Sequence, residues 1–131
     1  TEANAETCVE EILRFDPALH MFTRWAYEEV EVMGHTFRRG DQVALLLAAA
    51  NRDPGVWEAP EQFRPLRPIK PNVTFGAGLH FCVGAPLARL ELITALPILM
   101  RRLPGLRLAA PPEYGNVYHF HGLTRLMVAA D

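Results

Sequence analysis

Hydrophobic and polar positions recur with two different periods along the chain, and the change of period divides it into elements. Apolar residues repeat at helical spacing over residues 3–15 and again from about residue 86 to residue 103, so both stretches are predicted helices. Acidic side chains near the start of the first helix suit its dipole, and Pro17 follows its end. The second helix is expected to end before Pro104 and Gly105.

The region between the helices carries strand signals. Residues 18–24 are expected to run extended, and residues 27–33 alternate between apolar and acidic side chains, which predicts a strand. Glycine-containing turns on both sides of residues 35–37 predict a small antiparallel sheet. The apolar stretch 43–50 is expected to be buried, and its periodicity leaves open whether it is a strand or a helix.

The remaining segments have little periodicity. Residues 54–71 contain five prolines and predict an irregular but packed meander, and residues 72–84 form a loop that contains glycines. Residues 106–108 and 123–128 alternate over short stretches that suit strands. The expected fold class is therefore mainly α with small antiparallel β-sheets.

Length and composition exclude several classes of protein. The 131 residues, of which 50% are hydrophobic and 21% charged, suit one compact domain covering residues 1–131. The net charge of −2 argues against nucleic-acid binding, and no apolar run could cross a bilayer. The start of the chain shows no export signal, and two distant cysteines supply neither a disulfide framework nor a structural zinc site. We therefore expect a cytoplasmic protein that contacts neither nucleic acid nor membrane.

The most informative stretch reads Phe-Gly-Ala-Gly-Leu-His-Phe-Cys-Val-Gly, residues 75–84. It places Cys82 just before the second helix, among three glycines that let backbone N–H groups approach a sulfur atom or a flat ligand. The positive end of the helix dipole favours a thiolate there. This environment suits a soft anionic metal ligand, and the alternative is a structural cysteine buried in a loop.

The stretch resembles the haem-binding loop of the cytochrome P450 family, the haem-thiolate monooxygenases, whose pattern is F-x-x-G-x-H-x-C-x-G. Residues 87–92, Leu-Ala-Arg-Leu-Glu-Leu, look like the soluble bacterial branch of that family. The resemblance implies that Cys82 is the axial thiolate on the iron of haem b, which favours O–O cleavage. It also implies that His80 reaches a haem propionate, that Phe75 packs beside the sulfur and that Gly76 belongs to the cofactor-binding loop.

The first helix carries a second motif of the same family. Glu11 and Arg14 match its E-x-x-R pattern, although two such residues taken alone are usually a surface ion pair. In the family the pair is buried and is anchored to an arginine of the meander. Gln62 stands where many relatives have that arginine, so Arg67, or alternatively Arg64, is expected to take its place.

Other positions carry weaker signals. By the same resemblance Arg24 matches an arginine that pairs with a haem propionate, and the alternative is a solvated arginine beside a strand. Residues 18–23 and the turn near Phe120 and His121 look like segments that border a substrate pocket, or else ordinary core. We predict no metal pair from His119 and His121, and no partner can be named for His20, His35 or His119. Cys8 is expected to be a buried structural thiol.

The resemblance extends over nearly the whole chain but matches only the C-terminal third of a complete relative. It implies the C-terminal proximal part of the cytochrome P450 fold, from an enzyme that inserts one oxygen atom of O2 into a small organic substrate. The electrons would come from a ferredoxin or flavodoxin docking near Arg89, Arg101 and Arg102. Two alternatives stay open: a truncated, non-catalytic fragment with weak or no haem binding, and a thiolate-haem enzyme that uses peroxide or rearranges its substrate without oxygen.

Overall fold

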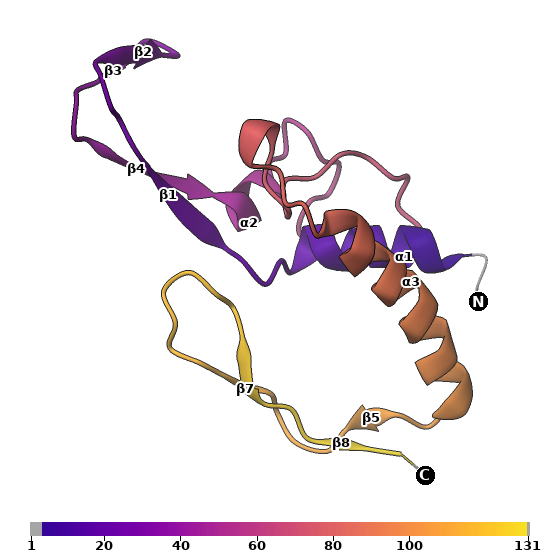
Figure 1. The fold of residues 1–131 in the computed structure, drawn as a ribbon. Coiled ribbons are helices and arrows are strands. Elements are labelled where there is room, and N and C mark those ends of the chain that lie inside the picture. Colours follow the sequence, from indigo (N-terminus) through magenta and orange to yellow (C-terminus); the bar gives the residue numbers. More distant parts are fainter. Residues whose placement is uncertain (1–3, 131) are drawn as a thin grey trace.

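Two helices meet at the centre of the molecule. The computed structural model describes residues 4–130, and in it α1 (Ala5–Phe15) lies against the start of α3 (Ala85–Arg102) (Figure 1). The predicted helix ends agree with these bounds to within two residues, except that residue 3 lies outside the described range. The α1 backbone stops ahead of Pro17, and α3 starts with a proline in its first turn and continues through Pro97 to Arg102.

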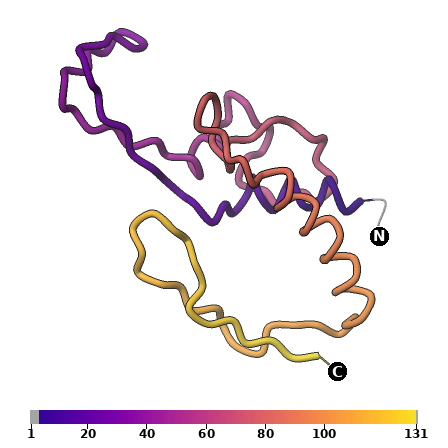
Figure 2. Tube along the Cα trace, viewed as in Figure 1, coloured from indigo at the N-terminus to yellow at the C-terminus, as the bar shows by residue number. Residues whose placement is uncertain are grey.

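The strands form small antiparallel sheets, as the alternation predicts. Within residues 4–130 there are four sheets of two strands each. The pairs are β1 (Met21–Trp25) with β4 (Gln42–Leu46), β2 (Val30–Val32) with β3 (His35–Phe37), β5 (Arg107–Leu108) with β8 (Val128–Ala129), and β6 (Glu113–Tyr114) with β7 (Leu123–Arg125). Figure 2 shows that the chain after α1, which carries the first two sheets, projects to one side of the helices, and that the chain after α3, in yellow, forms a separate arm. The fold is therefore a mixed α and β fold, and the expectation of a mainly α fold is too narrow.

The hairpin of β2 and β3 is shorter than the alternation predicts. Its loop consists of Met33 and Gly34, both at positive φ, which is the geometry of a two-residue hairpin turn. The pairing ends at Val30 opposite Phe37, so only Val30–Val32 of the predicted strand 27–33 is strand. Residues that have no partner strand cannot continue the ladder, whatever their alternation.

The apolar stretch 43–50 is divided between two elements. Its first part belongs to β4, and its last four residues form the short helix α2 (Leu47–Ala50). Leu47 is buried, but Leu45 and Leu46 are exposed, so the expectation of burial is wrong for most of the stretch. The reason is that β4 packs mainly against its partner β1 among the described elements, and no helix lies over most of this stretch.

The interior contains almost as many polar as apolar side chains. Its apolar part is small and lies around α1, with Val9 and Trp57 among the most buried members. The buried polar or charged side chains are Glu11, Arg14, Asn51, Arg67 and Thr74. The meander of residues 54–71 is irregular, as predicted, and supplies part of this interior. None of the helices in the described part of the chain is long and apolar enough to cross a membrane.

Candidate functional site

The loop that carries Cys82 is held in a defined shape by its own backbone. Gly76 has φ +72° and Gly78 has φ +67°, backbone values that residues other than glycine rarely adopt. The N–H of Cys82 donates to the carbonyl oxygen of Phe75 at 3.0 Å, so the loop closes on itself around a short 3-10 turn at Gly78–His80. The carbonyl oxygen of Cys82 then accepts from the N–H of Ala85 at 3.2 Å, which joins the loop to α3.

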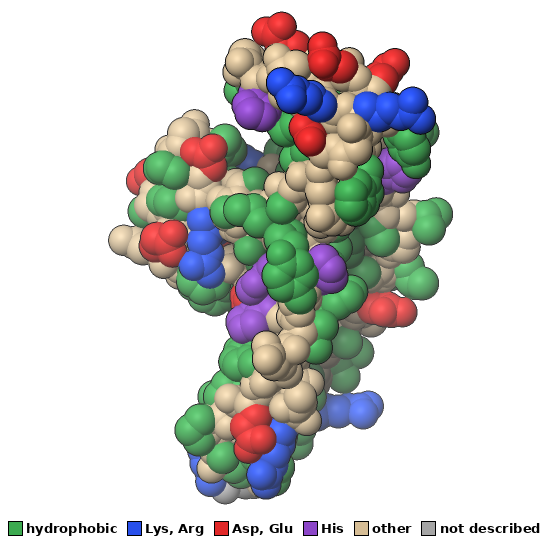
Figure 3. Space-filling view, turned by 90° about the vertical axis from the view of Figure 1, so that its left-hand side faces the viewer, with side chains coloured by type: hydrophobic (Ala, Val, Ile, Leu, Met, Phe, Trp, Pro, Cys, Tyr) green, Lys and Arg blue, Asp and Glu red, His purple; other side chains and the backbone are tan. Residues whose placement is uncertain are grey.

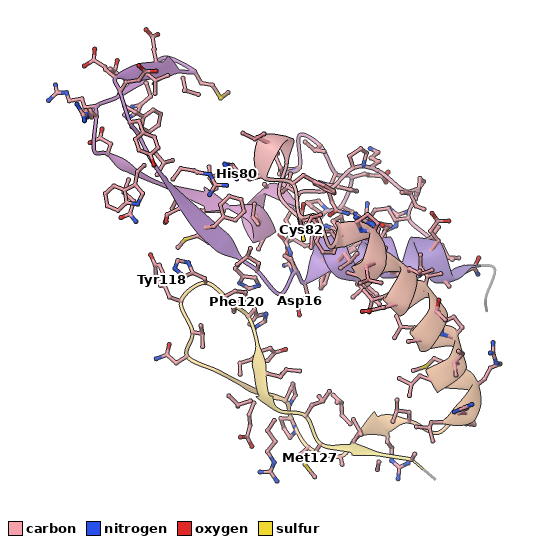
Figure 4. The ribbon with its side chains drawn as sticks, in the orientation of Figure 1. Asp16, His80, Cys82, Tyr118, Phe120 and Met127 are labelled. Atoms are coloured by element: carbon pink, nitrogen blue, oxygen red, sulfur yellow. The ribbon has the colours of Figure 1, made fainter. Side chains whose placement is uncertain are left out.

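Cys82 presents an accessible sulfur at the amino end of a long helix. Its side chain is exposed and its thiol is free. Figure 4 shows Cys82 near the start of α3, where α3 approaches α1. His80, which precedes Cys82 in the loop, lies nearer to β1. A Cβ atom on Gly84 would lie 3.8 Å from the Cys82 Sγ, so a glycine there keeps one side of the sulfur uncrowded. This arrangement fits a thiolate ligand whose negative charge faces the positive end of the α3 dipole.

The other residues predicted around the cofactor are brought to the same region. Gly76 is buried, and a Cβ atom there would lie 3.8 Å from the Phe22 ring. The guanidinium of Arg24 stacks on the same Phe22 ring, 4.3 Å from its centroid. Phe22 of β1 thus links Arg24 to the cysteine loop. Within residues 4–130 neither Arg24 nor His80 pairs with a carboxylate, and both side chains are exposed.

Phe75 is packed from the other side of the loop by α3. The guanidinium of Arg89 lies 4.8 Å from the centre of the Phe75 ring. Arg89 also forms an ion pair with Glu10 of α1. Glu10 in turn accepts from the side-chain amide of Asn72 at 3.0 Å, at the start of the loop. Arg89 is predicted to offer positive charge to a docking partner. Its charge is already paired with Glu10 inside the protein, which weighs against that role.

The structure brings Glu11, Arg14 and Arg67 together in a buried network. Arg14 is 1% exposed and makes a two-pronged ion pair with Glu11, at 2.7 and 2.9 Å. The Arg67 Nε lies 3.2 Å from the same carboxylate. Arg64 contacts Glu11 through its backbone N–H at 2.8 Å, while its side chain pairs with the exposed Glu58. Of the two candidates in the meander, Arg67 is thus the arginine whose side chain reaches Glu11.

The two arginines also bind the meander by its backbone. Their remaining N–H groups donate to carbonyl oxygens, and these acceptors are on Asn51, Pro60 and Gln62 for Arg14 and on Glu58, Ala59 and Gln62 for Arg67. A segment without regular structure has backbone carbonyls that need partners, and a guanidinium offers five donors in a rigid plane. The network therefore fixes the irregular meander against α1.

The environment of Glu11 favours its charged form. Burial raises the pKa of Glu11, but hydrogen bonds from Arg14, from the backbone of Arg64 and from Arg67 outweigh burial, and the net result is a pKa below its ordinary value of 4.5. The folded state thus binds this proton less readily than the unfolded chain does. Glu11 contributes stability that is fully present above about pH 4.5 and is lost as the pH falls through the lowered pKa.

We expect the free energy of unfolding to fall more steeply below pH 4.5 in the native protein than in the Glu11→Gln variant. The variant starts less stable but has no carboxylate at position 11 to protonate, while every other acidic residue is retained. Urea unfolding followed by circular dichroism at several pH values between neutrality and acid measures both slopes. Equal slopes would show that the network does not hold the pKa of Glu11 down.

Sequence reasoning missed the polar residues that anchor the start of the loop. Asn51 is buried, its side-chain Nδ2 donates to the Thr74 hydroxyl at 2.9 Å, and its side-chain Oδ1 accepts from the Val73 N–H at 2.8 Å. The Thr74 hydroxyl donates to the Leu13 carbonyl of α1 at 2.7 Å. Asn51 ends an apolar run, where an asparagine is adequately explained as a turn residue, so its tertiary role carries no separate sequence signal.

More than two thirds of the chain matches a single protein family. The model of the family "Cytochrome P450" matches residues 5–105. The chain belongs to the cytochrome P450 family. It is 42% identical over 126 residues to a biotin biosynthesis cytochrome P450 of Bacillus subtilis, a match that covers 95% of this chain and 32% of that protein. It is also 46% identical over 99 residues to a 20-oxo-5-O-mycaminosyltylactone 23-monooxygenase of Streptomyces fradiae, covering 76% of this chain and 24% of that enzyme.

Solved structures of cytochromes P450 contain the same fold. P450BioI, solved in complex with an acyl carrier protein ligated to hexadec-9Z-enoic acid, superposes with a TM-score of 0.95 at 40% identity and covers 100% of this chain. The chain spans 34% of P450BioI, so it corresponds to about a third of a complete cytochrome P450. Its relatives are bacterial oxidoreductases of this family, and its own structure is a mixed α and β part of the cytochrome P450 fold.

Proposed function

We propose that the chain is the C-terminal, proximal part of a cytoplasmic cytochrome P450 monooxygenase, and that Cys82 is the axial ligand of its haem b. The observation that carries the proposal is the free, exposed thiol of Cys82 at the amino end of α3, in a loop where Gly76 and Gly78 adopt positive φ. An added Cβ atom on Gly78 would meet no heavy atom within 4 Å, so the loop is open at this glycine. These features fit a flat cofactor bound through sulfur.

The residues around the loop divide the work of holding the cofactor. Cys82 supplies the thiolate, and Phe75 and Gly76 shape the loop beside it. His80 and Arg24 are exposed and unpaired with any carboxylate of the described residues, so they are available for the two propionates. Glu11, Arg14 and Arg67 act one step away, because they hold the meander that leads into the loop.

A thiolate-ligated haem, when bound, supplies O2 activation and the insertion of one oxygen atom into a small organic substrate. This chain would contribute the proximal wall, formed by the cysteine loop and the amino end of α3. A ferredoxin or flavodoxin is the proposed electron donor. The basic residues of α3 are the ones we propose for its docking: Arg101 and Arg102 in its last turn, and Arg89, which is at the same time paired with Glu10.

The test is made on the native protein that contains this chain. Its intact mass gives the native length, and the absorption spectrum of its reduced carbon monoxide complex reports the thiolate ligand. We expect a protein about three times as long as this chain, a thiolate-type spectrum and oxidation of an organic substrate that depends on O2 and a ferredoxin or flavodoxin. A native protein of 131 residues without bound haem would instead support a non-catalytic fragment, and turnover with peroxide alone or without O2 would support the other chemistry of the family.

A further inference from the structure

A cluster of possible metal ligands lies away from the cysteine loop, at the junction of α1 and β1. One ligand atom from each of Asp16, His20 and His121 lies within 4.8 Å of the others. The Asp16 Oδ1 is 2.9 Å from the His121 Nδ1 and 3.8 Å from the His20 Nε2. Asp16 and His20 are four positions apart, whereas His121 comes from a distant part of the chain, the loop between β6 and β7.

The backbone holds the two histidines in this position. Leu19 and Phe120 form an antiparallel bridge, flanked by hydrogen bonds from the His20 N–H to the His119 carbonyl at 3.0 Å and from the His121 N–H to the Ala18 carbonyl at 2.9 Å. In such a ladder His20 and His121 are diagonal neighbours on one face. Figure 4 shows Asp16 and Phe120 on the two facing segments, and Figure 3 shows histidine side chains gathered in the middle of one face of the molecule.

Aromatic contacts restrict the histidine rings further. The His121 ring is stacked on Tyr114, with centroids 4.1 Å apart and planes 8° apart, and it also contacts the His20 ring at 4.6 Å. Tyr114 belongs to β6, which is paired with β7 and not with the segment around Leu19. The His121 imidazole is therefore oriented by its own hairpin as well as by the segment that it faces.

The ligand types and spacings suit a divalent transition metal ion. Two imidazole nitrogens and one carboxylate oxygen are ligands of catalytic or open zinc sites, with water in the fourth position. In a tetrahedral site with bonds of about 2.0–2.1 Å, neighbouring ligand atoms are about 3.3 Å apart, so small side-chain rotations of the observed cluster suffice. The three side chains are a third to a half exposed, which gives an ion and its water access. The nearby carboxyl end of α1 also favours a cation.

The competing explanation is a simple ion pair between Asp16 and a protonated histidine. An ion pair needs one imidazole, whereas here two imidazoles face the same carboxylate oxygen. Asp16 also has no lysine or arginine partner among residues 4–130, so nothing else neutralises it there. A divalent ion satisfies all three groups at once, with both histidines neutral.

We infer that Asp16, His20 and His121 bind a zinc ion or a similar divalent transition metal ion, and that this ion joins the C-terminal arm to the junction of α1 and β1. The site is independent of the cysteine loop and does not rest on haem binding. It would reinforce the Leu19–Phe120 bridge, which pairs the C-terminal arm with a segment of the first half of the chain.

The test is a titration of chelator-treated protein, containing all of residues 1–131, with zinc chloride by isothermal calorimetry. We expect one ion per chain and no response to magnesium chloride, because magnesium prefers an all-oxygen site. His121→Ala and Asp16→Asn should each weaken zinc binding by at least about tenfold, since even the loss of an outer ligand contact costs 10–100-fold. His35→Ala is the matched control, because His35 is in β3 and contacts Phe37 instead.

Two further measurements keep the result unambiguous. Zinc should raise the melting temperature of the native protein and of His35→Ala but not of His121→Ala, which separates a lost site from a misfolded variant. Cobalt chloride should give the visible absorption of a nitrogen and oxygen site without the intense sulfur-to-metal band that binding to Cys82 would produce. Absence of zinc binding in the native protein, equal binding in His35→Ala and His121→Ala, or a sulfur-to-cobalt band alone would each overturn the assignment.

Discussion

Replacing Cys82 with alanine is expected to abolish the thiolate-type spectrum of the reduced carbon monoxide complex in the protein that contains this chain. Alanine removes the only donor atom of that side chain and keeps the backbone contacts that shape the loop. Those contacts are the Cys82 N–H to the Phe75 carbonyl and the Ala85 N–H to the Cys82 carbonyl, and neither involves the sulfur. The loss should therefore come from the missing ligand rather than from a collapsed loop, and circular dichroism should be unchanged.

Cys8→Ala is the matched control for this experiment. Cys8 is the other free cysteine, it lies half-buried on α1, and its replacement should leave the spectrum intact. The half-burial also corrects the expectation that Cys8 is a buried thiol. A thiolate spectrum that survives in Cys82→Ala, or one that disappears in Cys8→Ala, would show that Cys82 is not the ligand.

Replacing Arg14 with methionine is expected to cost about 3–5 kcal/mol of unfolding free energy, the range found when one partner of a buried ion pair is removed. Methionine keeps an unbranched apolar side chain but removes the guanidinium, with its hydrogen bonds and its contact with the Trp57 ring. Glu11, only 2% exposed, then loses its two-pronged partner. Because whole domains are stable by about 5–15 kcal/mol, much of the protein should be unfolded and the yield low.

Arg64→Met is the control for the loss of a charge in the same network. The Arg64 side chain pairs with Glu58 at the surface, and such exposed pairs contribute about 0–1 kcal/mol. Its backbone N–H would still donate to Glu11 in the variant. Urea unfolding of both variants should thus show a large loss for Arg14→Met and a small one for Arg64→Met. Similar losses in the two variants would contradict the proposed role of the buried pair.

The parts of the fold that depend on local pattern could be predicted from the sequence. Both long helices, the turn at Met33 and Gly34 and the irregular meander agree with the structure, because periodicity, prolines and glycines act within a few residues. The extent of β2 and the exposure of Leu46 could not be predicted in this way. Both depend on which strands are available as neighbours, and a strand of suitable composition stays exposed or unpaired when no neighbour covers it.

In the candidate site, too, features that depend on local pattern could be predicted from the sequence and features that depend on distant segments could not. The motif residues could be named from their spacing, but choosing between Arg64 and Arg67 required the path of the meander, which brings one side chain inward and leaves the other outside. The acceptors of Arg14 are backbone carbonyls, which have no signature in the sequence. The meeting of His20 with His121 likewise depends on a pairing between distant segments.

The long reach of Arg14 also bears on the order in which the chain folds. Its guanidinium binds carbonyls 37, 46 and 48 positions further along, and Arg67 reaches Glu11 across 56 positions. Such contacts require large loops to close first, whereas α1 and α3 need only local bonds. We therefore expect the helices to form early and the network to close late. Interactions that close after the transition state act on the rate of unfolding, so we expect these long-range contacts to govern how long the folded protein lasts more than how fast it forms.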